Sequence, residues 1–144
     1  MISPQTLRGY AATTYAVTDP DGDMTGLRLG EPSTQADALL RQMKAQSLTC
    51  LNAWNPYSRR LPVNRNMAAH QRLRRDLDAR GLRHLPHLGV PDSPLWRPEP
   101  GFALLDAGTE KAIALAERYG QLGIVRYERG GVADLILTRL ASNR

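Results

Sequence analysis

The sequence predicts an α+β fold in which about three helices pack on a single layer of mixed or mostly antiparallel sheet. Two observations lead to this class. Short runs rich in β-branched and aromatic residues occur in pairs around turn sequences, as they do in β-hairpins. Between them lie three stretches whose apolar residues recur at helical spacing, each beginning near a capping residue. The expected order of elements is ββαβαββαββ.

The first half of the chain is predicted to form a hairpin, a helix and a strand. Two β-rich runs within residues 13–30 flank a turn sequence of Asp, Pro and Gly, in which Gly22 accepts a positive φ. Ser33 is expected to cap a helix, because apolar residues follow it at i, i+3, i+4 and i+7, namely Ala36, Leu39, Leu40 and Met43. Residues 47–51 form the third expected strand, and the loop at 52–63 follows it.

Two further helices are expected in the second half. Asn64 is predicted to cap the first of them, which runs to about Arg80 and ends at Gly81. Its inward row is polar in the first half and apolar in the second: Asn66, His70, Leu73 and Leu77. Thr109 is predicted to cap the other helix, which Gly120 ends.

The remaining elements of the second half are strands and a loop. Residues 86–100 contain five prolines and are therefore predicted to form a loop and no regular element. Strands are expected on either side of it, at 82–85 and 101–105. A closing hairpin is expected over residues 123–137, with two consecutive glycines in its turn.

Size and composition predict one globular domain. The 144 residues fit a single domain, with a core over about residues 10–137 and short tails at both ends. Hydrophobic residues make up 42% and charged residues 23%, which argues against a disordered chain. No apolar run approaches the ~18–20 residues that span a bilayer, and residues 1–8 lack the pattern of a secretory signal. These features, and a single Cys50 that cannot form an internal disulfide, predict a cytoplasmic location.

The positive charge is concentrated in one segment. The net charge is +5, whereas residues 59–84 contain eight arginines and two aspartates, a local balance of +6. Such a cluster is typical of a surface for an anionic partner, although solvated helix faces are also often rich in arginine. The arginines proposed for that surface are Arg59, Arg60, Arg65, Arg72 and Arg75.

Metal sites and cofactor motifs are not predicted. The aspartates at 19, 21 and 23 resemble a calcium loop, but the glycine and glutamate that such a loop needs are misplaced, so a turn explains them better. His84 and His87 are close in sequence, but no tight ligand set accompanies them, and they are interpreted as a surface or loop pair. Cys50 lies in mid-strand and is interpreted as a buried, inert thiol. The phosphate-loop, dinucleotide and serine-hydrolase motifs are absent from the sequence.

Polar residues gather at the ends of predicted elements. Asn52, Trp54, Asn55 and Ser58 follow a strand end, where sheet folds commonly bind ligands, and carboxamides suit a neutral or zwitterionic molecule. The alternative is that the two asparagines satisfy backbone groups of the loop while Trp54 fills the core. Elsewhere, one Arg-x-x-Glu pair, Arg28 and Glu31, could grip an anion or form an ordinary ion pair.

These segments resemble a bacterial family catalogued as domain of unknown function 3293. The resemblance spans about residues 10–137 and is strongest at Ala53-Trp54-Asn55-Pro56-Tyr57-Ser58. It also includes residues 27–32, the Trp96-Arg97-Pro98-Glu99-Pro100 segment and Tyr119-Gly120-Gln121. The chain departs from the family in having Gly101 where a serine is usual and Tyr119 where phenylalanine is common. The resemblance implies an arrangement but no activity, because none is attached to the family.

Three functional hypotheses follow. The leading one is that polar residues converge at one edge of the sheet and bind a small polar metabolite: Arg28, Glu31, Asn52, Trp54, Asn55, Ser58, Glu99 and Gln121. The second is an enzyme that uses Glu31 or Glu99 as a general acid or base, which requires burial of the carboxyl group. The third is binding of nucleic acid or an acidic partner through the arginine cluster. No catalytic residue, metal or cofactor is assigned from the sequence.

Overall fold

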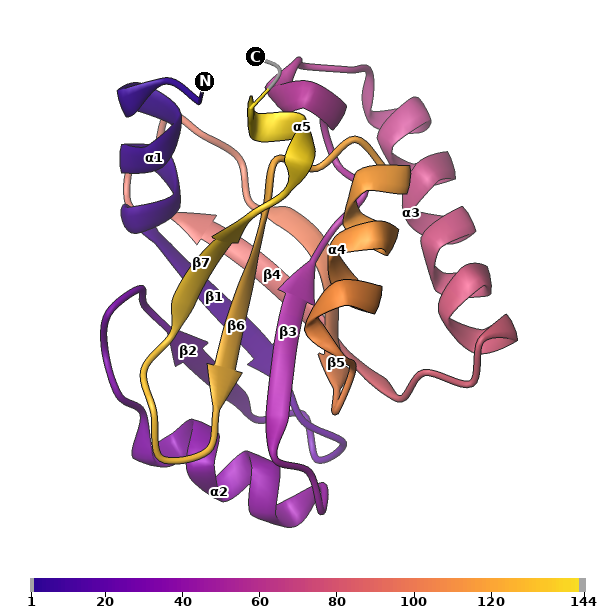
Figure 1. Cartoon of the computed structure of the whole chain (residues 1–144). Coiled ribbons are helices and arrows are strands. Elements are labelled where there is room, and N and C mark those ends of the chain that lie inside the picture. The colour runs from indigo at the N-terminus through magenta and orange to yellow at the C-terminus, as the bar shows by residue number, and fades with distance from the viewer. Residues whose placement is uncertain (1, 143–144) are drawn as a thin grey trace.

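A computed structural model describes residues 2–142 and contains one seven-stranded sheet (Figure 1). All of its strand pairs are antiparallel, in the spatial order β2-β1-β4-β5-β3-β6-β7. The strands are β1 (Thr13–Thr18), β2 (Met24–Leu27), β3 (Ser47–Leu51), β4 (His84–Pro91), β5 (Glu99–Leu105), β6 (Gly123–Glu128) and β7 (Asp134–Leu137). The helices are α1 (Pro4–Ala11), α2 (Thr34–Gln42), α3 (Val63–Ala79), α4 (Thr109–Arg118), α5 (Arg139–Ser142) and the 3₁₀ turn η1 (Pro56–Ser58).

The sheet is curled so that its two edges meet. Leu29, just after β2, forms an isolated parallel bridge with Ala133, just before β7. The backbone N–H of Gly30 donates to the carbonyl of Ala133 at 2.8 Å, and the N–H of Ala133 donates to the carbonyl of Glu31 at 3.2 Å. The curled sheet therefore has an inner face, which it encloses, and an outer face.

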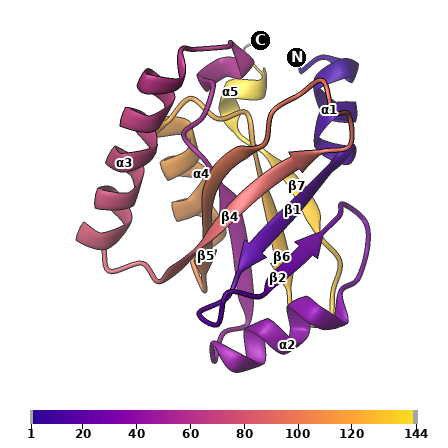
Figure 2. The same cartoon turned by 180° about the vertical axis from the view of Figure 1, so that it is seen from behind.

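Separate apolar cores lie on the two faces. On the inner face, alternate residues of the strands pack together with Leu39 and Leu40 of α2. On the outer face, α3 and α4 cover the sheet through Leu73, Leu77 and Leu115 and their neighbours, and Figure 2 shows both helices on that side. Because side chains of a strand alternate between faces, the parity of a strand residue decides which core it joins.

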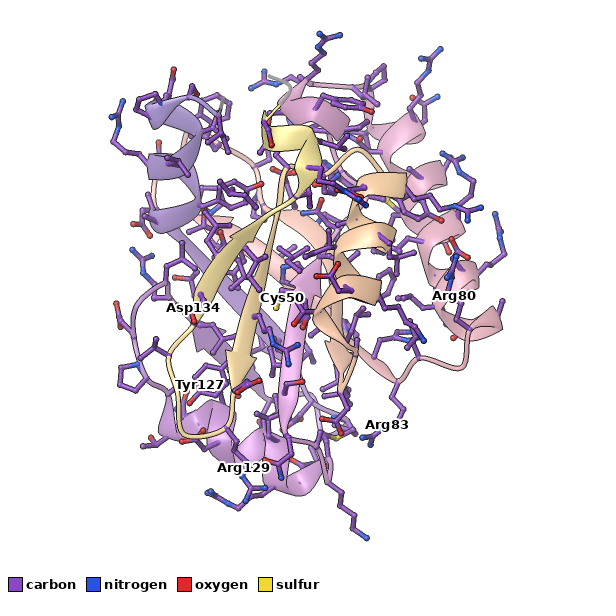
Figure 3. The ribbon with its side chains drawn as sticks, in the orientation of Figure 1. Cys50, Arg80, Arg83, Tyr127, Arg129 and Asp134 are labelled. Carbon is purple, nitrogen blue, oxygen red and sulfur yellow. The ribbon has the colours of Figure 1, made fainter. Side chains whose placement is uncertain are left out.

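Tyr127 fixes α2 across one end of the curled sheet (Figure 3). Its side chain is fully buried, and its hydroxyl lies 2.7 Å from the Oδ1 atom of Asp37 and accepts a hydrogen bond from the N–H of Ser33. The N–H of Gly130 also donates to Asp37, and these hydrogen bonds lower the pKa of the carboxyl group. The opposite end of the sheet, near α1, contains the candidate site.

Much of the sequence prediction is confirmed. The structure is α+β, and between α1 and α5 its helices and strands follow the expected order ββαβαββαββ, with η1 an added turn. The hydroxyl of Ser33 accepts from the N–H of Ala36 as a cap, and Gly81 and Gly120 end α3 and α4 with positive φ. Asp19 accepts from two backbone N–H groups in the turn of the first hairpin, which explains the aspartate run. Among the described helices none is long and apolar enough to cross a membrane.

The predicted loop over residues 86–100 is wrong in part, because β4 extends to Pro91 and β5 begins at Glu99. β4 pairs with β1 over residues 87–91 and with β5 over residues 84–89, while β5 pairs with β3 only from Phe102 onward. The prolines inside these strands are Pro86, Pro91 and Pro100. Each of them lies where its strand has one neighbour instead of two, a position that tolerates a missing N–H.

The helix starts also differ from the prediction. Asn64 and Thr109 lie inside α3 and α4 and do not cap them, because Pro62 and Gly108 occupy the cap positions. The N-terminal and C-terminal segments, predicted as tails, contain the short helices α1 and α5.

Candidate functional site

The carboxamides between β3 and α3 brace the loop that contains them. The Oδ1 atom of Asn52 accepts from the N–H of Trp54 at 3.0 Å. The Oδ1 atom of Asn55 accepts from the N–H of Leu61 and from the Nδ2 atom of Asn66, and the N–H of Asn55 donates to Asn66 Oδ1. Asn66 is only 1% exposed, so the polar first half of the α3 inner row is explained by this network.

Replacing Asn66 with alanine is expected to lower the free energy of unfolding by about 1–2 kcal/mol, because the N–H and Oδ1 of Asn55 lose their buried partner. Urea denaturation of Asn66→Ala measures this loss. Asn64→Ala serves as the control, because Asn64 lies exposed on the same helix. Equal stability of the two variants would contradict the bracing role.

The turn after α4 meets the same loop. The Nε2 atom of Gln121 donates to the carbonyls of Trp54 and Tyr119 at 3.1 Å each, and the N–H of Tyr57 donates to the carbonyl of Gly120 at 2.7 Å. The structure therefore brings Gln121 and the segment after β3 together, but the Gln121 amide donates to backbone carbonyls and so braces the loop. Ser58 is exposed at the end of η1.

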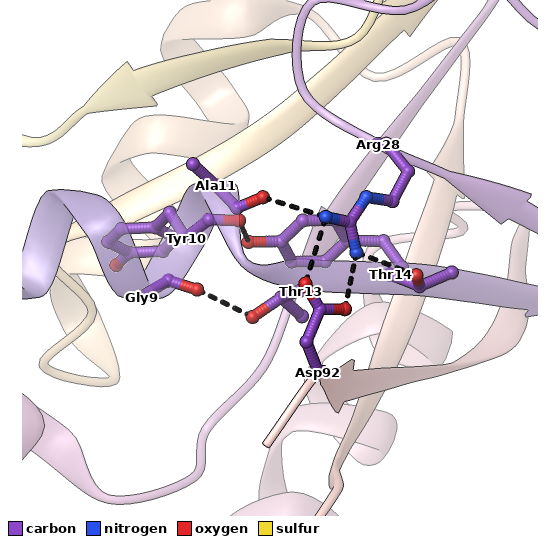
Figure 4. Close-up of polar contacts among 8 residues, drawn as sticks. Gly9, Tyr10, Ala11, Thr13, Thr14, Arg28 and Asp92 are labelled. Carbon is purple, nitrogen blue, oxygen red and sulfur yellow. Dashed lines mark hydrogen bonds and ion pairs between the residues drawn. The ribbon is translucent and has the colours of Figure 1, made fainter.

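Arg28 is held in a structural ion pair with Asp92, beside the end of α1 (Figure 4). Its guanidinium donates to both carboxylate oxygens of Asp92, at 2.6 and 3.0 Å, and to Thr14 Oγ1 and the carbonyl of Ala11. The hydrogen bonds with Arg28 lower the pKa of Asp92. The partner considered from the sequence, Glu31, is exposed and does not form this pair.

Glu99 differs from the other predicted site residues. It is half-buried at the start of β5, and within residues 2–142 its carboxyl group forms no hydrogen bond or ion pair. Its register partner on β4 is Gly89, which in turn is opposite Tyr15 on β1. Burial raises the pKa of Glu99 to about 7. Glu99 therefore lies on the inner face of the sheet. Gly89, which has no side chain, lies between it and Tyr15.

Two tyrosines lie beside Glu99. The hydroxyl of Tyr15 donates to the carbonyl of Tyr10 at 2.9 Å, and the ring of Tyr10 packs against the inner core. Burial, and to a smaller extent the charge of Glu99, raises the pKa of Tyr10 to about 12. Burial is also the largest cause of the raised pKa of Tyr15. Both phenols are therefore neutral hydrogen-bonding groups at neutral pH.

His87 is the residue that sequence reasoning missed. It lies inside β4, is 5% exposed, and stacks on Tyr15 with ring centroids 6.2 Å apart, so its interpretation as part of a surface or loop pair is wrong. Its buried Nδ1 atom has no hydrogen-bond partner among the described residues, and burial lowers its pKa to about 4. The alternation of Leu85, His87 and Gly89 is the signal for an inward strand face, but the prolines obscured it.

Glycines provide the space at this end of the sheet. A Cβ atom added at Gly101 would lie 2.7 Å from the ring of His87 and 2.4 Å from the carbonyl of Leu51, so His87 fills that position. A Cβ atom added at Gly89 would meet only ordinary contacts, at 3.6 Å and 3.7 Å. We call Tyr10, Tyr15, His87 and Glu99 the inner-end site, with Gly89 at its centre.

The other candidate groups contribute no site. In the described part of the chain no three His, Cys, Asp or Glu residues are arranged to hold a metal ion. Cys50 is buried near the middle of the sheet, where burial raises its pKa to about 12 (Figure 3). A groove of 330 Å³ lies beside α5, and its charged lining residue, Arg139, is paired with Glu117 at 2.8 Å.

The arginine cluster divides into two parts. Arg80 is paired with Asp76 at 3.2 Å, and Arg83 lies 3.5 Å from Asp106, both near the end of α3 (Figure 3). The five arginines proposed for an anionic partner are all exposed: Arg59, Arg60, Arg65, Arg72 and Arg75.

Comparison with known proteins yields one match. The model of a family described as "Protein of unknown function (DUF3293)" matches residues 51–124. This stretch includes His87, Glu99 and Gln121, whereas Tyr10 and Tyr15 precede it. No curated protein and no solved structure matches the chain.

Proposed function

The chain belongs to the DUF3293 family of proteins of unknown function, and from the inner-end site we propose that it binds a small polar molecule through a cationic amine. The observation that carries this proposal is the half-buried carboxyl group of Glu99, which has no hydrogen-bonding or ionic partner among residues 2–142. A buried carboxylate is costly without a counter-charge, and a bound cation would supply one.

The surroundings of Glu99 suit an organic cation. Tyr10 and Tyr15 lie near enough to Glu99 that, in addition to burial, its charge raises their pKa, and aromatic rings of this kind attract ammonium groups. Their neutral hydroxyl groups and the unpartnered Nδ1 of His87 are further hydrogen-bonding groups. Gly89 leaves room between Tyr15 and Glu99. The carboxamides at 52 and 55 are assigned a bracing role in this proposal.

The proposal predicts that primary alkylamines raise the melting temperature at pH 8, whereas alcohols and carboxylates of the same carbon skeleton do not. An amine present at 100 times its dissociation constant adds about 2.7 kcal/mol to the free energy of unfolding. Binding should also be about tenfold weaker at pH 6 than at pH 8, because a Glu99 with a pKa of about 7 must lose its proton to pair with the cation.

Glu99→Gln should abolish the rise in melting temperature caused by amines, because it removes the negative charge while keeping the shape of the side chain. Glu31→Gln is the matched control, since Glu31 is an exposed carboxylate outside the site. Gly89→Leu, which fills the centre of the site while Glu99 remains, should also abolish binding. Amines that stabilise Glu99→Gln and the parent protein equally would overturn the proposal, and so would a wide amine panel without any shift.

General acid–base catalysis is a second candidate, favoured by the pKa of Glu99 near 7. A carboxyl group with such a pKa exchanges protons readily at neutral pH. Amines that carry an ester or amide bond provide the test, because such a bond can be hydrolysed with water by acid–base catalysis: mass spectrometry after prolonged incubation would reveal the acid and alcohol or amine products, which Glu99→Gln does not form. Unchanged amines would leave binding as the function and would remove the catalytic candidate.

A further inference from the structure

A surface that shares no residue with the inner-end site combines unpaired arginines with an exposed tryptophan. Between Asn52 and Arg75 the chain contains six arginines and no acidic residue. Within the described residues, the side chains of Arg59, Arg65, Arg72 and Arg75 form no ion pair or hydrogen bond. A helix face with this charge and no internal counter-charge is complementary to a polyanion.

The arginines of α3 lie along one side of the helix. Arg65, Arg72 and Arg75 are separated by seven and three residues, so they share a face, and all three are exposed. The 17 residues of α3 extend over about 25 Å, at 1.5 Å per residue. This face can therefore follow several phosphates of an extended strand.

The structure places an aromatic side chain, Trp96, beside this basic surface, which could not be foreseen from the sequence. The loop between β4 and β5 passes along the same end of the molecule as the start of α3 (Figure 2). Trp96 of this loop is 57% exposed, and the guanidinium of Arg60 lies 5.5 Å from the centroid of its ring. Arg97 follows it and is also exposed. A large exposed ring held by an arginine at the end of a basic face is an arrangement on which a base can stack.

We infer that the surface formed by Trp96, Arg60 and the α3 arginines Arg65, Arg72 and Arg75 binds single-stranded nucleic acid. The arginines contact phosphates, and one base stacks on the free face of the indole. Bases offer stacking faces only when they are unpaired, so single strands are preferred over duplexes. This inference is independent of the inner-end site, whose residues face the inside of the sheet.

Fluorescence anisotropy with a labelled 12-nucleotide single-stranded RNA tests the surface. We expect binding at 50 mM salt that weakens with salt at a slope of about −3 in log K against log salt, for about four phosphate contacts. Replacing the three α3 arginines with alanine should reduce that slope by about 2, at 0.7 per lost contact. A double-stranded oligonucleotide of the same length should bind at least tenfold more weakly.

Matched variants separate stacking and position from net charge. Trp96→Ala should weaken binding about tenfold, Trp96→Phe should restore most of it, and Trp96→Leu should not, because a base stacks on a ring and not on an aliphatic chain. A control for charge replaces three exposed arginines on other elements with alanine: Arg8, Arg41 and Arg129. Circular dichroism confirms that each variant is folded.

The alternative explanations give different results. Equal losses for the α3 and control triple variants would show non-specific charge attraction and would overturn the inference, as would the absence of binding at 50 mM salt. An exposed Leu95 beside Trp96 is also a feature of membrane-surface loops. Binding to anionic lipid vesicles that depends on Leu95, without binding to RNA, would assign the surface to membranes and would likewise overturn it.

Discussion

Replacing Gly120 with alanine is expected to lower the free energy of unfolding by about 3 kcal/mol, and the melting temperature by about 10 °C. Gly120 ends α4 with a φ of +71°, where an L-residue is strained, and an added Cβ atom would lie 2.6 Å from the Cβ atom of Pro56. The carbonyl of Gly120 also accepts the N–H of Tyr57, so relief of the clash would disturb this contact. Thermal and urea denaturation measure the loss.

Gly81→Ala is the matched control for this prediction. Gly81 ends α3 with a similar φ of +66°, but nothing lies within 4 Å of an added Cβ atom. Its replacement should therefore cost only the backbone strain, about 1 kcal/mol. Equal losses in the free energy of unfolding for the two variants would show that the close packing of the α4 turn on residues 56–57 adds nothing to the cost of Gly120→Ala.

Glu99→Gln is expected to stabilise the protein at pH 8 by about 2–3 kcal/mol and to leave its stability unchanged at pH 4. The pKa of Glu99 is about 7 in the folded protein and 4.5 as a free side chain, so between these values the folded state holds more protons than the unfolded state. The contribution of Glu99 to the free energy of unfolding therefore falls as pH rises from 4.5 to 7. Urea denaturation at intervals from pH 4 to pH 8 measures the difference between variant and parent.

Glu31→Gln serves again as the control and should show a flat difference over this range, because Glu31 is exposed. A flat difference for Glu99→Gln would contradict the burial of its carboxyl group.

His87 changes the free energy of unfolding with pH in the opposite direction. Its pKa falls from 6.5 to about 4 on folding, so its contribution is present above pH 6.5 and is lost as pH falls towards 4. The two slopes oppose each other in the parent, and Glu99→Gln should expose the acid sensitivity caused by His87.

The order of elements could be predicted from sequence because local signals determine it. Ser33, Gly81 and Gly120 act on the backbone next to them, and the period of apolar residues separates helices from strands. The prolines of β4 and β5 led to the prediction of a loop. A strand accepts a proline where no second strand pairs with it, and this depends on how far each neighbouring strand extends. That information lies in the register of the sheet, which no local pattern contains.

The candidate site could be predicted only in part for the same reason. Glu99 was among the predicted residues, whereas His87 and the tyrosines were not, because their meeting depends on the curl of the sheet and on the docking of α1. Arg28 shows the limit most clearly, since its partner Asp92 is 64 residues away in sequence. The carboxamides of Asn52 and Asn55 could bond to a ligand or to backbone groups of their own loop. The sequence does not distinguish these two uses.

The meeting of the sheet edges at Leu29 and Ala133 has a consequence for self-association. An open antiparallel sheet offers the unpaired backbone of its first and last strands to other chains, and such strands start aggregation. Here both edge strands have only four residues, and the backbone beside them is engaged across the closure. Each outer edge that remains is therefore only four residues long, which gives copies of the chain a short stretch of backbone on which to add strands.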